Sequence, residues 1–263
     1  MIFKKYSAFC LIVLALFVSG CGDSKGSPDQ PAGPVGSIRG RVRLVGDAPK
    51  PAQDAINQDQ KVCGDSVSLP RIALGKDNGV RSTFVFLEGV PETGKRPVAS
   101  KEPFHIDQKD CQYVPHSLIV PLGSKVEISN SDPILHNVHG SQGEASFNYA
   151  QARQGLRQEV DMGMMKPGII KLTCEAGHPW MNAFVYVATH PYVALTDDNG
   201  DFEIKNVPPG TYTIKMWHEG VTLKQIYKAL QAYDYEEPYE MTQQVTVSAG
   251  GEAAVNFDME LRK

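Results

Sequence analysis

Residues 169–181 read IIKLTCEAGHPWM, a β-branched run followed by a loop in which sulfur and nitrogen ligands are closely spaced. The run 169–173 predicts a strand, and Cys174, His178 and Met181 fall within the next eight residues. Soft sulfur ligands select Cu(I), and imidazole suits copper. A type 1 copper site combines two histidines, one cysteine and a weak axial methionine, so a second histidine must come from elsewhere in the chain.

The second histidine comes from residues 130–140, NSDPILHNVHG, which hold both His136 and His139. A strand ending in Asn, a loop with Pro, then His-Asn-Val and, about forty residues later, Cys, His and Met resembles the cupredoxins, which include plastocyanins, amicyanins and pseudoazurins. The resemblance covers roughly residues 82–187. It implies that Asn137 hydrogen-bonds across to the cysteine loop and holds that loop in place. It also implies type 1 copper held by His136, Cys174, His178 and Met181, with His139 left open as a replacement for His136.

Other uses of these residues stay open. Zinc accepts cysteine and histidine, although methionine is a poor zinc ligand, and a degenerate site would hold no metal. Trp180 either packs inward or belongs to an apolar patch around an exposed edge of His178, where redox partners dock on known cupredoxins. The nearby methionines either line the core or receive copper; they are Met162, Met164 and Met165.

Much of the remaining chain alternates apolar and polar residues with the period of a strand. Residues 37–45, SIRGRVRLV, show the pattern, and shorter β-rich runs lie at 82–87, 117–120 and 125–129. Gly, Pro, Asn and Asp separate them. Short strands divided by turn signals predict an all-β fold, which the resemblance specifies as a cupredoxin Greek-key β-sandwich.

A second resemblance lies in residues 196–214, TDDNGDFEIKNVPPGTYTI. They resemble the carboxypeptidase regulatory-like module, a small transthyretin-like β-sandwich that is also grouped with carbohydrate-binding-like folds. In such modules the first strand often reads like residues 36–44, so residues 38–46 belong either to the copper domain or to this module. The resemblance implies a folding or docking role, or glycan binding, and no catalytic residues.

One segment has the spacing of a helix. Apolar residues recur at i, i+3, i+4 and i+7 from Leu223 to Leu230, and Thr222 with Gln225 has the spacing of a capping box. We therefore expect one inserted helix over residues 222–233.

The N-terminus reads MIFKKYSAFCLIVLALFVSGCGDS. Its apolar run is too short to span a bilayer but suits a signal peptide, and VSGC at its end resembles a bacterial lipobox with an acylated Cys21. An ordinary secretory peptide is the alternative. We expect a membrane-anchored, exported protein at the periplasmic face of the outer membrane or at the cell surface. The predicted parts are a signal peptide (1–20), a flexible tether (21–37), a copper domain (38–191) and a regulatory-like module (192–263).

The five cysteines then divide by role. Cys10 leaves with the signal peptide, Cys21 takes the lipid, and Cys174 stays free as a ligand. An exported chain lives where disulfides persist, so we expect Cys63 and Cys111 to form a disulfide.

Charge and motif content narrow the function. With 26 Lys+Arg against 30 Asp+Glu, the chain has no basic excess for nucleic acid. No Ser/His/Asp set is recognisable, which argues against an enzyme. The leading expectation is a single-electron carrier with a redox protein partner. The alternatives are a copper-binding or copper-delivery lipoprotein and a structural or carbohydrate-binding surface protein. Together the two resemblances look like proteins often labelled methylamine utilization proteins, a label from which we infer no methylamine chemistry.

Overall fold

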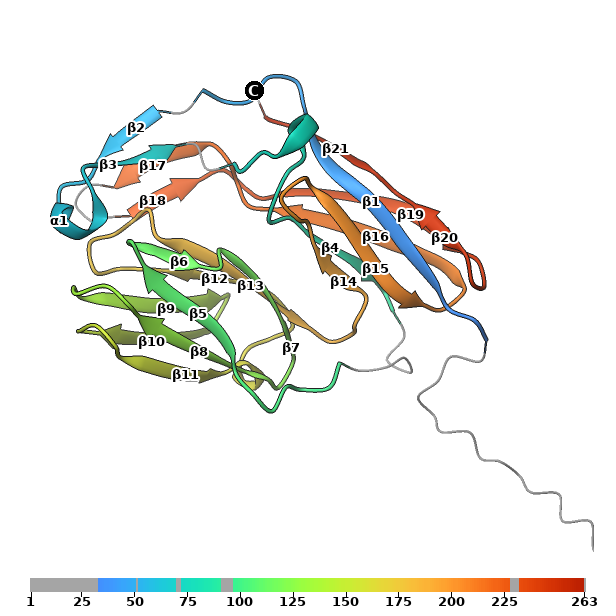
Figure 1. Ribbon diagram of the computed structural model, residues 1–263, viewed down its shortest axis with the longest axis horizontal. Helices are drawn as coiled ribbons and strands as arrows, with labels where there is room; N and C mark the ends of the chain where they lie inside the picture. Colours follow the sequence, from blue (N-terminus) through green and yellow to red (C-terminus); the bar gives the residue numbers. More distant parts are fainter. Residues whose placement is uncertain (1–32, 51, 70–71, 91–96, 228–231, 263) are drawn as a thin grey trace, which may run out of the picture. The chain divides into compact units, whose positions relative to one another are not determined.

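The computed structural model describes residues 33–50, 52–69, 72–90, 97–227 and 232–262. Within these ranges the chain is built almost entirely from strands (Figure 1). The helices described are three single turns: α1 (Gln60–Cys63), η1 (Lys76–Asn78) and η2 (Met162–Met164). None of the helices in these ranges is long and apolar enough to cross a membrane. The predicted all-β fold class is confirmed.

Two sheets enclose the first apolar core. One sheet has the strand order β10 (Ala145–Gln151), β9 (His136–Gln142), β12 (Gly168–Thr173), β13 (Asn182–Ala188), β7 (Ser117–Pro121). The other has the order β11 (Arg157–Asp161), β8 (Lys125–Asn130), β5 (Phe104–Lys109), β6 (Gln112–Val114). Alternate residues of each strand enter the core, such as Val126 and Ile128 of β8, because successive side chains of a strand point to opposite faces.

Two further sheets enclose a second core. The first has the order β15 (Asp201–Val207), β1 (Gly36–Val45), β20 (Glu252–Ala254), and β21 (Phe257–Glu260) also pairs with β1. The second has the order β14 (Val193–Leu195), β4 (Phe84–Glu88), β16 (Gly210–His218), β19 (Tyr239–Val247). The structure is thus a pair of β-sandwiches.

The second sandwich takes two of its strands from the N-terminal part of the chain. β1, in the segment that the sequence left open between two domains, pairs with β15, β20 and β21. Ile38, Val42 and Leu44 of this strand enter the second core. β4 lies within the range predicted for the copper domain, yet it pairs with β14 and β16. The C-terminal sandwich is therefore discontinuous in sequence.

β13 joins the two sandwiches, because both of its faces are buried. Val185 and Val187 point into the first core. Phe184 and Tyr186 point the other way and form a separate apolar cluster with Trp217 of β16 and with β4. The continuous apolar run of this strand follows from contacts on both faces.

The predicted helix over residues 222–233 is wrong. The described residues there form β17 (Leu223–Tyr227) and β18 (Ala232–Tyr235), which pair antiparallel with Leu223 opposite Tyr235. Glu236 closes the base of this hairpin: its carboxylate accepts from the main-chain N–H of Thr222 at 2.9 Å, and its own N–H donates to the Thr222 carbonyl at 2.9 Å. Thr222 therefore pairs across the hairpin and does not cap a helix.

A second small hairpin follows β1 in the sequence. β2 (Ala52–Ala55) and β3 (Ser66–Leu69) pair antiparallel, with α1 between them. We call residues 52–69 the strap. Ile56 of the strap is only 2% exposed and belongs to the first core, although β1 just before it belongs to the second sandwich.

Candidate metal centre

Three neighbouring strands bring the predicted ligands together at one end of a sheet, where these strands begin or finish. β9 and β12 are antiparallel, so the start of β9 and the end of β12 lie together. His136 is the first residue of β9, and Cys174 directly follows β12. The loop from Cys174 leads into β13, with His178 at its middle and Met181 at its end. The register of these strands therefore places the candidate ligands before any metal is considered.

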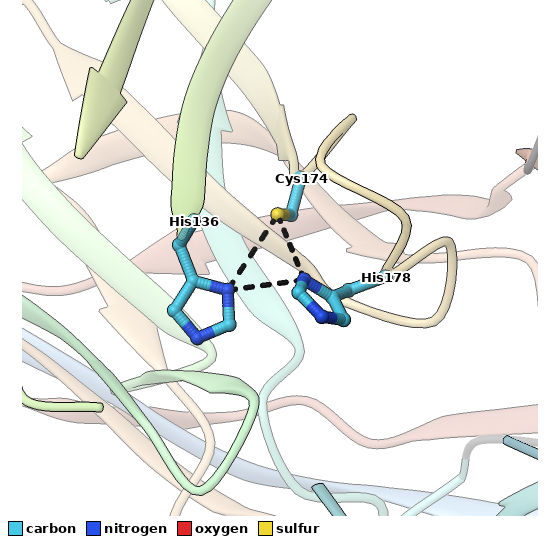
Figure 2. A group of neighbouring side chains, drawn as sticks. All are labelled: His136, Cys174 and His178. Atoms are coloured by element: carbon cyan, nitrogen blue, oxygen red, sulfur yellow. Dashed lines mark hydrogen bonds between the residues drawn. The ribbon is translucent and has the colours of Figure 1, made fainter. Parts of the chain in front are cut away.

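A thiol and two imidazoles converge in a buried group (Figure 2). The Sγ of Cys174 lies 3.8 Å from Nδ1 of His136 and 3.6 Å from Nδ1 of His178, and the two Nδ1 atoms are 3.1 Å apart. Both histidines have no exposed surface, and Cys174 is 3% exposed. These three atoms are close enough to share one ion.

Each imidazole is held from behind by a carboxylate. Nε2 of His136 lies 2.9 Å from Oδ2 of Asp132, and Nε2 of His178 lies 3.0 Å from Oδ2 of Asp59. A neutral imidazole carries one N–H, and a carboxylate partner places it on Nε2. Both Nδ1 atoms then present lone pairs to the same point, beside a sulfur. Two lone pairs 3.1 Å apart repel each other unless a cation lies near them, so the donor set fits a soft metal ion.

Burial controls the proton equilibria of the group. It raises the pKa of the Cys174 thiol, while the main-chain N–H groups of Asn137 and Ala176 act in the opposite direction. Burial also lowers the pKa of His178, and the neighbouring His136 lowers it further, against the effect of Asp59. His178 is therefore neutral at neutral pH. A metal would displace the thiol proton, because the thiolate is the ligand form.

Met181 closes the ligand loop on itself. Its carbonyl accepts from the N–H of Cys174 at 3.2 Å, and its N–H donates to the carbonyl of His178 at 2.9 Å. The side chain has no exposed surface and belongs to the same apolar core as Cys174. All four predicted ligands are therefore buried at one end of the first sandwich.

His136, and not His139, belongs to the cluster. The two are three positions apart on β9, so their side chains leave opposite faces of the strand. His139 instead places Nδ1 2.7 Å from Oε1 of Glu175, and its side chain is 28% exposed. The N–H of Glu175 also donates to Oδ1 of Asn137, so Asn137 makes the hydrogen bond to the cysteine loop that the sequence suggested.

Trp180 packs inward. It is 5% exposed, its Nε1 donates to the carbonyl of Cys111 at 3.1 Å, and its ring centre lies 5.4 Å from that of His178. Because both side chains are buried, Trp180 and His178 do not form an exposed apolar patch. Met162 and Met165 lie in the first core, and Met164 is exposed.

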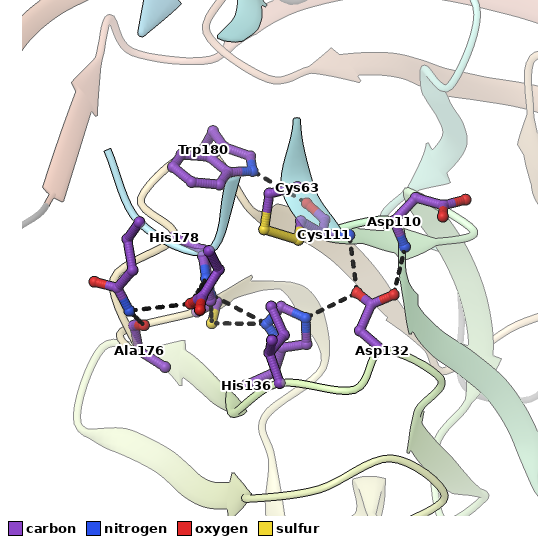
Figure 3. Close-up of a disulfide and its surroundings, with 12 residues drawn as sticks. Cys63, Asp110, Cys111, Asp132, His136, Ala176, His178 and Trp180 are labelled. Carbon is purple, nitrogen blue, oxygen red and sulfur yellow. Dashed lines mark hydrogen bonds and ion pairs between the residues drawn. A yellow bond between two sulfur atoms is a disulfide. The ribbon is translucent and has the colours of Figure 1, made fainter. Parts of the chain in front are cut away.

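The predicted disulfide between Cys63 and Cys111 is present (Figure 3). It links the strap to the turn between β5 and β6. A second cluster of candidate metal ligands contains Cys111 with Asp132 and His136, but the sulfur of Cys111 is occupied by the disulfide.

Two residues of the site were missed from the sequence. Asp132 lies four residues before His136, a spacing that gives no signal in a loop. Asp59 is 119 positions away from His178 and reaches it only because the strap folds back. Asp132 lies within the stretch 130–140, but the motif is defined by the Asn, Pro and His-Asn-Val positions, and Asp59 lies outside both ligand segments.

Several sequence predictions concern residues that the structure does not describe. The signal peptide, Cys21 and the larger part of the tether lie outside the described residues. The end of the predicted tether is described, and Gly36 and Ser37 begin β1.

Comparison with known families gives one partial match. Residues 170–260 match the carboxypeptidase regulatory-like domain. The match starts in β12 of the first sandwich and continues through the C-terminal strands to β21. No curated protein matches the sequence.

Solved structures with local similarity include three copper proteins. A Cu-containing nitrite reductase from Thermus scotoductus SA-01 is 24% identical, over 35% of this chain and 25% of its own, with a TM-score of 0.30. A purple cupredoxin from Nitrosopumilus maritimus is 25% identical, over 32% of this chain and 99% of its own, with a TM-score of 0.28. An amicyanin variant in its reduced Cu(I) form is 22% identical, over 40% and 98%, with a TM-score of 0.30. Each similarity covers less than half of this chain, and this chain spans a quarter of the nitrite reductase.

Proposed function

We propose that this chain binds one copper ion as a type 1 site and carries single electrons. The observation that supports the proposal is the donor set: a cysteine sulfur and two histidine Nδ1 atoms, 3.1 to 3.8 Å apart and buried. Two histidines and a cysteine in one plane with a methionine nearby are the ligands of blue-copper electron-transfer sites. Met181 is the methionine of the same loop and would be the weak axial ligand.

The residues of the chain contribute rigidity and exclusion of water. His136 is fixed by Asp132, His178 is fixed by Asp59, and the loop bearing Cys174 is tied by main-chain bonds at both of its ends. Copper bound there would supply a one-electron change between Cu(II) and Cu(I). Because a fixed ligand set rearranges little when the charge of the ion changes, this arrangement favours electron transfer over substrate chemistry.

Addition of Cu(II) to the metal-free protein tests the proposal. We expect an intense visible absorption from the thiolate–copper bond, at one copper per chain, and a reversible one-electron reduction. Cys174→Ser abolishes the absorption, and His136→Ala greatly weakens binding. The matched control is His139→Ala, three residues further along β9, which leaves the spectrum unchanged because His139 faces Glu175.

Three outcomes contradict the electron carrier. Tight Cu(I) binding without reversible redox cycling identifies a copper-delivery protein instead. Stoichiometric binding of Zn(II) in preference to copper identifies a zinc site. No stoichiometric metal at all leaves a structural β-sandwich protein.

A spectrum that survives Cys174→Ser but not His139→Ala places the ion outside the proposed ligand set.

A further inference from the structure

The carboxylate behind His178 is rigidly linked to the strap cysteine. Asp59 precedes α1, and its carbonyl accepts from the N–H groups of Val62 and Cys63, both at 2.9 Å. It holds a left-handed backbone conformation with φ of 52°. The main chain of Cys63 is therefore hydrogen-bonded directly to that of Asp59.

A neighbouring contact fixes the strap to the ligand loop as well. Gln58 donates from Nε2 to the carbonyl of Ala176 at 2.9 Å, two residues before His178. Gly177 lies between Ala176 and His178, and a Cβ on Gly177 would meet the Gln58 side chain at 2.2 Å. The Gln58 side chain therefore lies directly over Gly177, and Gln58 holds the residue before Asp59 against the ligand loop.

The carboxylate behind His136 is linked in the same way to the other cysteine. Oδ2 of Asp132, which contacts the His136 ring, also accepts from the N–H of Cys111 at 2.9 Å. Oδ1 of Asp132 accepts from the N–H of Asp110 at 2.9 Å. Asp110 and Cys111 have φ of 52° and 54°, a conformation that non-glycine residues keep only when their surroundings hold it. Asp132 and the disulfide both hold this turn.

The Cys63–Cys111 disulfide connects these two supports directly. It joins Cα atoms 5.2 Å apart, one four residues from Asp59 and the other bonded to Asp132. Figure 3 shows the part of this chain of contacts that runs from His136 through Asp132 and Cys111 to Cys63. At the other end, Asp59 contacts Nε2 of His178 at 3.0 Å. The two histidines come from different segments, yet the carboxylates on their outer nitrogens are connected through the disulfide and through the hydrogen bond from the Cys111 N–H to Asp132.

We infer that Asp59, Asp132 and the Cys63–Cys111 disulfide form one positioning scaffold that holds both imidazoles with Nδ1 toward Cys174. Asp59 and Asp132 are positioning residues, since they act through the histidines. The identity of the ion rests on the proposed function, whereas the orientation of the rings is a property of the metal-free chain. The two can therefore be tested separately.

The orientation is tested in metal-free protein by long-range ¹H–¹⁵N spectra of the histidine rings at neutral pH. In the wild type we expect His136 and His178 each as a single Nε2–H tautomer. Asp59→Ala gives His178 a mixture of tautomers and leaves His136 unchanged. Asp59→Asn restores the single tautomer, because its amide oxygen accepts the same hydrogen bond. The matched control is Asp65→Ala, which removes the same charge from the same strap and changes neither ring.

Metal retention tests the consequence, with Co(II) as the probe and a chelator as the competitor. Loss of an outer partner of a metal-bound histidine typically weakens metal binding by about 10–100-fold, and we expect that loss for Asp59→Ala. Cys63→Ser/Cys111→Ser weakens binding at least as much and disturbs both rings. Combined with Asp59→Ala, the cysteine pair gives a loss smaller than the product of the separate losses, because both changes release the same strap.

Two results overturn the scaffold. The first is a loss of metal affinity in the combined variant equal to the product of the losses in the separate variants. The second is an Asp59→Ala effect no greater than that of Asp65→Ala. If a variant does not fold, reduction of the disulfide in the wild-type protein gives the same ring spectra without a substitution, and unchanged spectra reject the inference. If the ring spectra respond as expected but no variant or wild type shows the copper absorption, the scaffold stands and the copper proposal fails.

Discussion

At the scale of single residues, the burial of His178 bears on how a partner of the proposed electron carrier could approach the candidate metal centre. The resemblance to cupredoxins suggested an exposed histidine edge as the docking point. In this structure the ring has no exposed surface, and Asp59 occupies its outer nitrogen. If the chain carries electrons as proposed, a partner could not contact the His178 ring directly, and each electron would have to cross an intervening layer of protein.

His218 gives a pH dependence of stability that is separate from the metal site. It lies at the end of β16, 3% exposed, with Nδ1 2.8 Å from the carbonyl of Glu219. Burial lowers its pKa below the ordinary value of 6.5, against the effect of Glu219. Below about pH 6.5 the unfolded chain binds this proton while the folded chain does not, so the free energy of unfolding falls as the pH falls.

We therefore expect denaturant unfolding of the metal-free protein to show decreasing stability from pH 7.5 to pH 5.5, with a flatter profile for His218→Asn. The asparagine can still donate to the Glu219 carbonyl, which limits the loss at high pH. Equal slopes for the two proteins would assign the effect to other histidines whose pKa burial lowers, such as the buried His178 or the partly exposed His190.

The sequence pointed to the side chains that cluster at the candidate site better than it pointed to the carboxylates that hold them. Cys174, His178 and Met181 stand within one short loop, so their spacing is visible in the sequence. The choice between His136 and His139 needed only the face of a strand, which became known with the register of β9. Asp59 is brought in by tertiary folding, and no local pattern marks it.

At the scale of elements, the centre of β1 has no room for a side chain at Gly40. It is flanked by β15 on one side and by β20 and β21 on the other. A Cβ on Gly40 would lie 1.5 Å from the carbonyl oxygen of Val255 and 2.9 Å from the ring of Phe202. The close approach of these backbones therefore requires glycine at this position.

Gly40→Ala should lower the free energy of unfolding by about 1–3 kcal/mol, the usual cost of overpacking, through displacement of the chain at Val255. Thermal and denaturant unfolding measure it. Arg39→Ala is the control in the same strand: it removes an exposed ion pair with Glu203 and should leave Tm nearly unchanged. If Gly40→Ala lowers the free energy of unfolding no more than Arg39→Ala does, the strand has room for a methyl group at Gly40.

The β17–β18 hairpin shows where the sequence pattern failed. Leu223, Ile226 and Tyr227 match helical spacing, but isoleucine and tyrosine also favour strands. Glu236 decides the outcome by closing the hairpin base at Thr222. A pairing of residues fourteen positions apart does not appear in a periodicity that extends over two turns.

At the scale of the whole molecule, the C-terminal sandwich depends on strands from the beginning of the chain. Its core includes Ile38, Val42 and Leu44 from β1 and Val85 and Leu87 from β4. The sequence recognised the module by its hairpin and its Pro-Pro-Gly turn, which are local. The sequence analysis left the domain of β1 open and assigned β4 to the copper domain. Pairing between strands so far apart in the sequence produces no local sequence pattern.

A fragment of residues 192–263 should consequently not fold by itself. Without β1 and β4, both of its sheets lose a central strand and the core loses its N-terminal members. We expect no near-ultraviolet circular dichroism and no cooperative thermal transition, whereas residues 33–263 show both. A cooperative transition in the fragment would mean that the C-terminal strands suffice for the module.

The same discontinuity has a consequence for the time course of synthesis. β1 is made early, but Arg43 of this strand must wait for Asp258, 215 positions later. At roughly 5–20 residues per second, that is a delay of about 10 to 40 seconds. During this interval the first sandwich, whose strands lie between residues 104 and 188, can be complete while β1 still lacks its neighbours. The nascent chain therefore carries an unpaired amphipathic strand, and chaperone capture or premature release should affect the second sandwich before the metal centre.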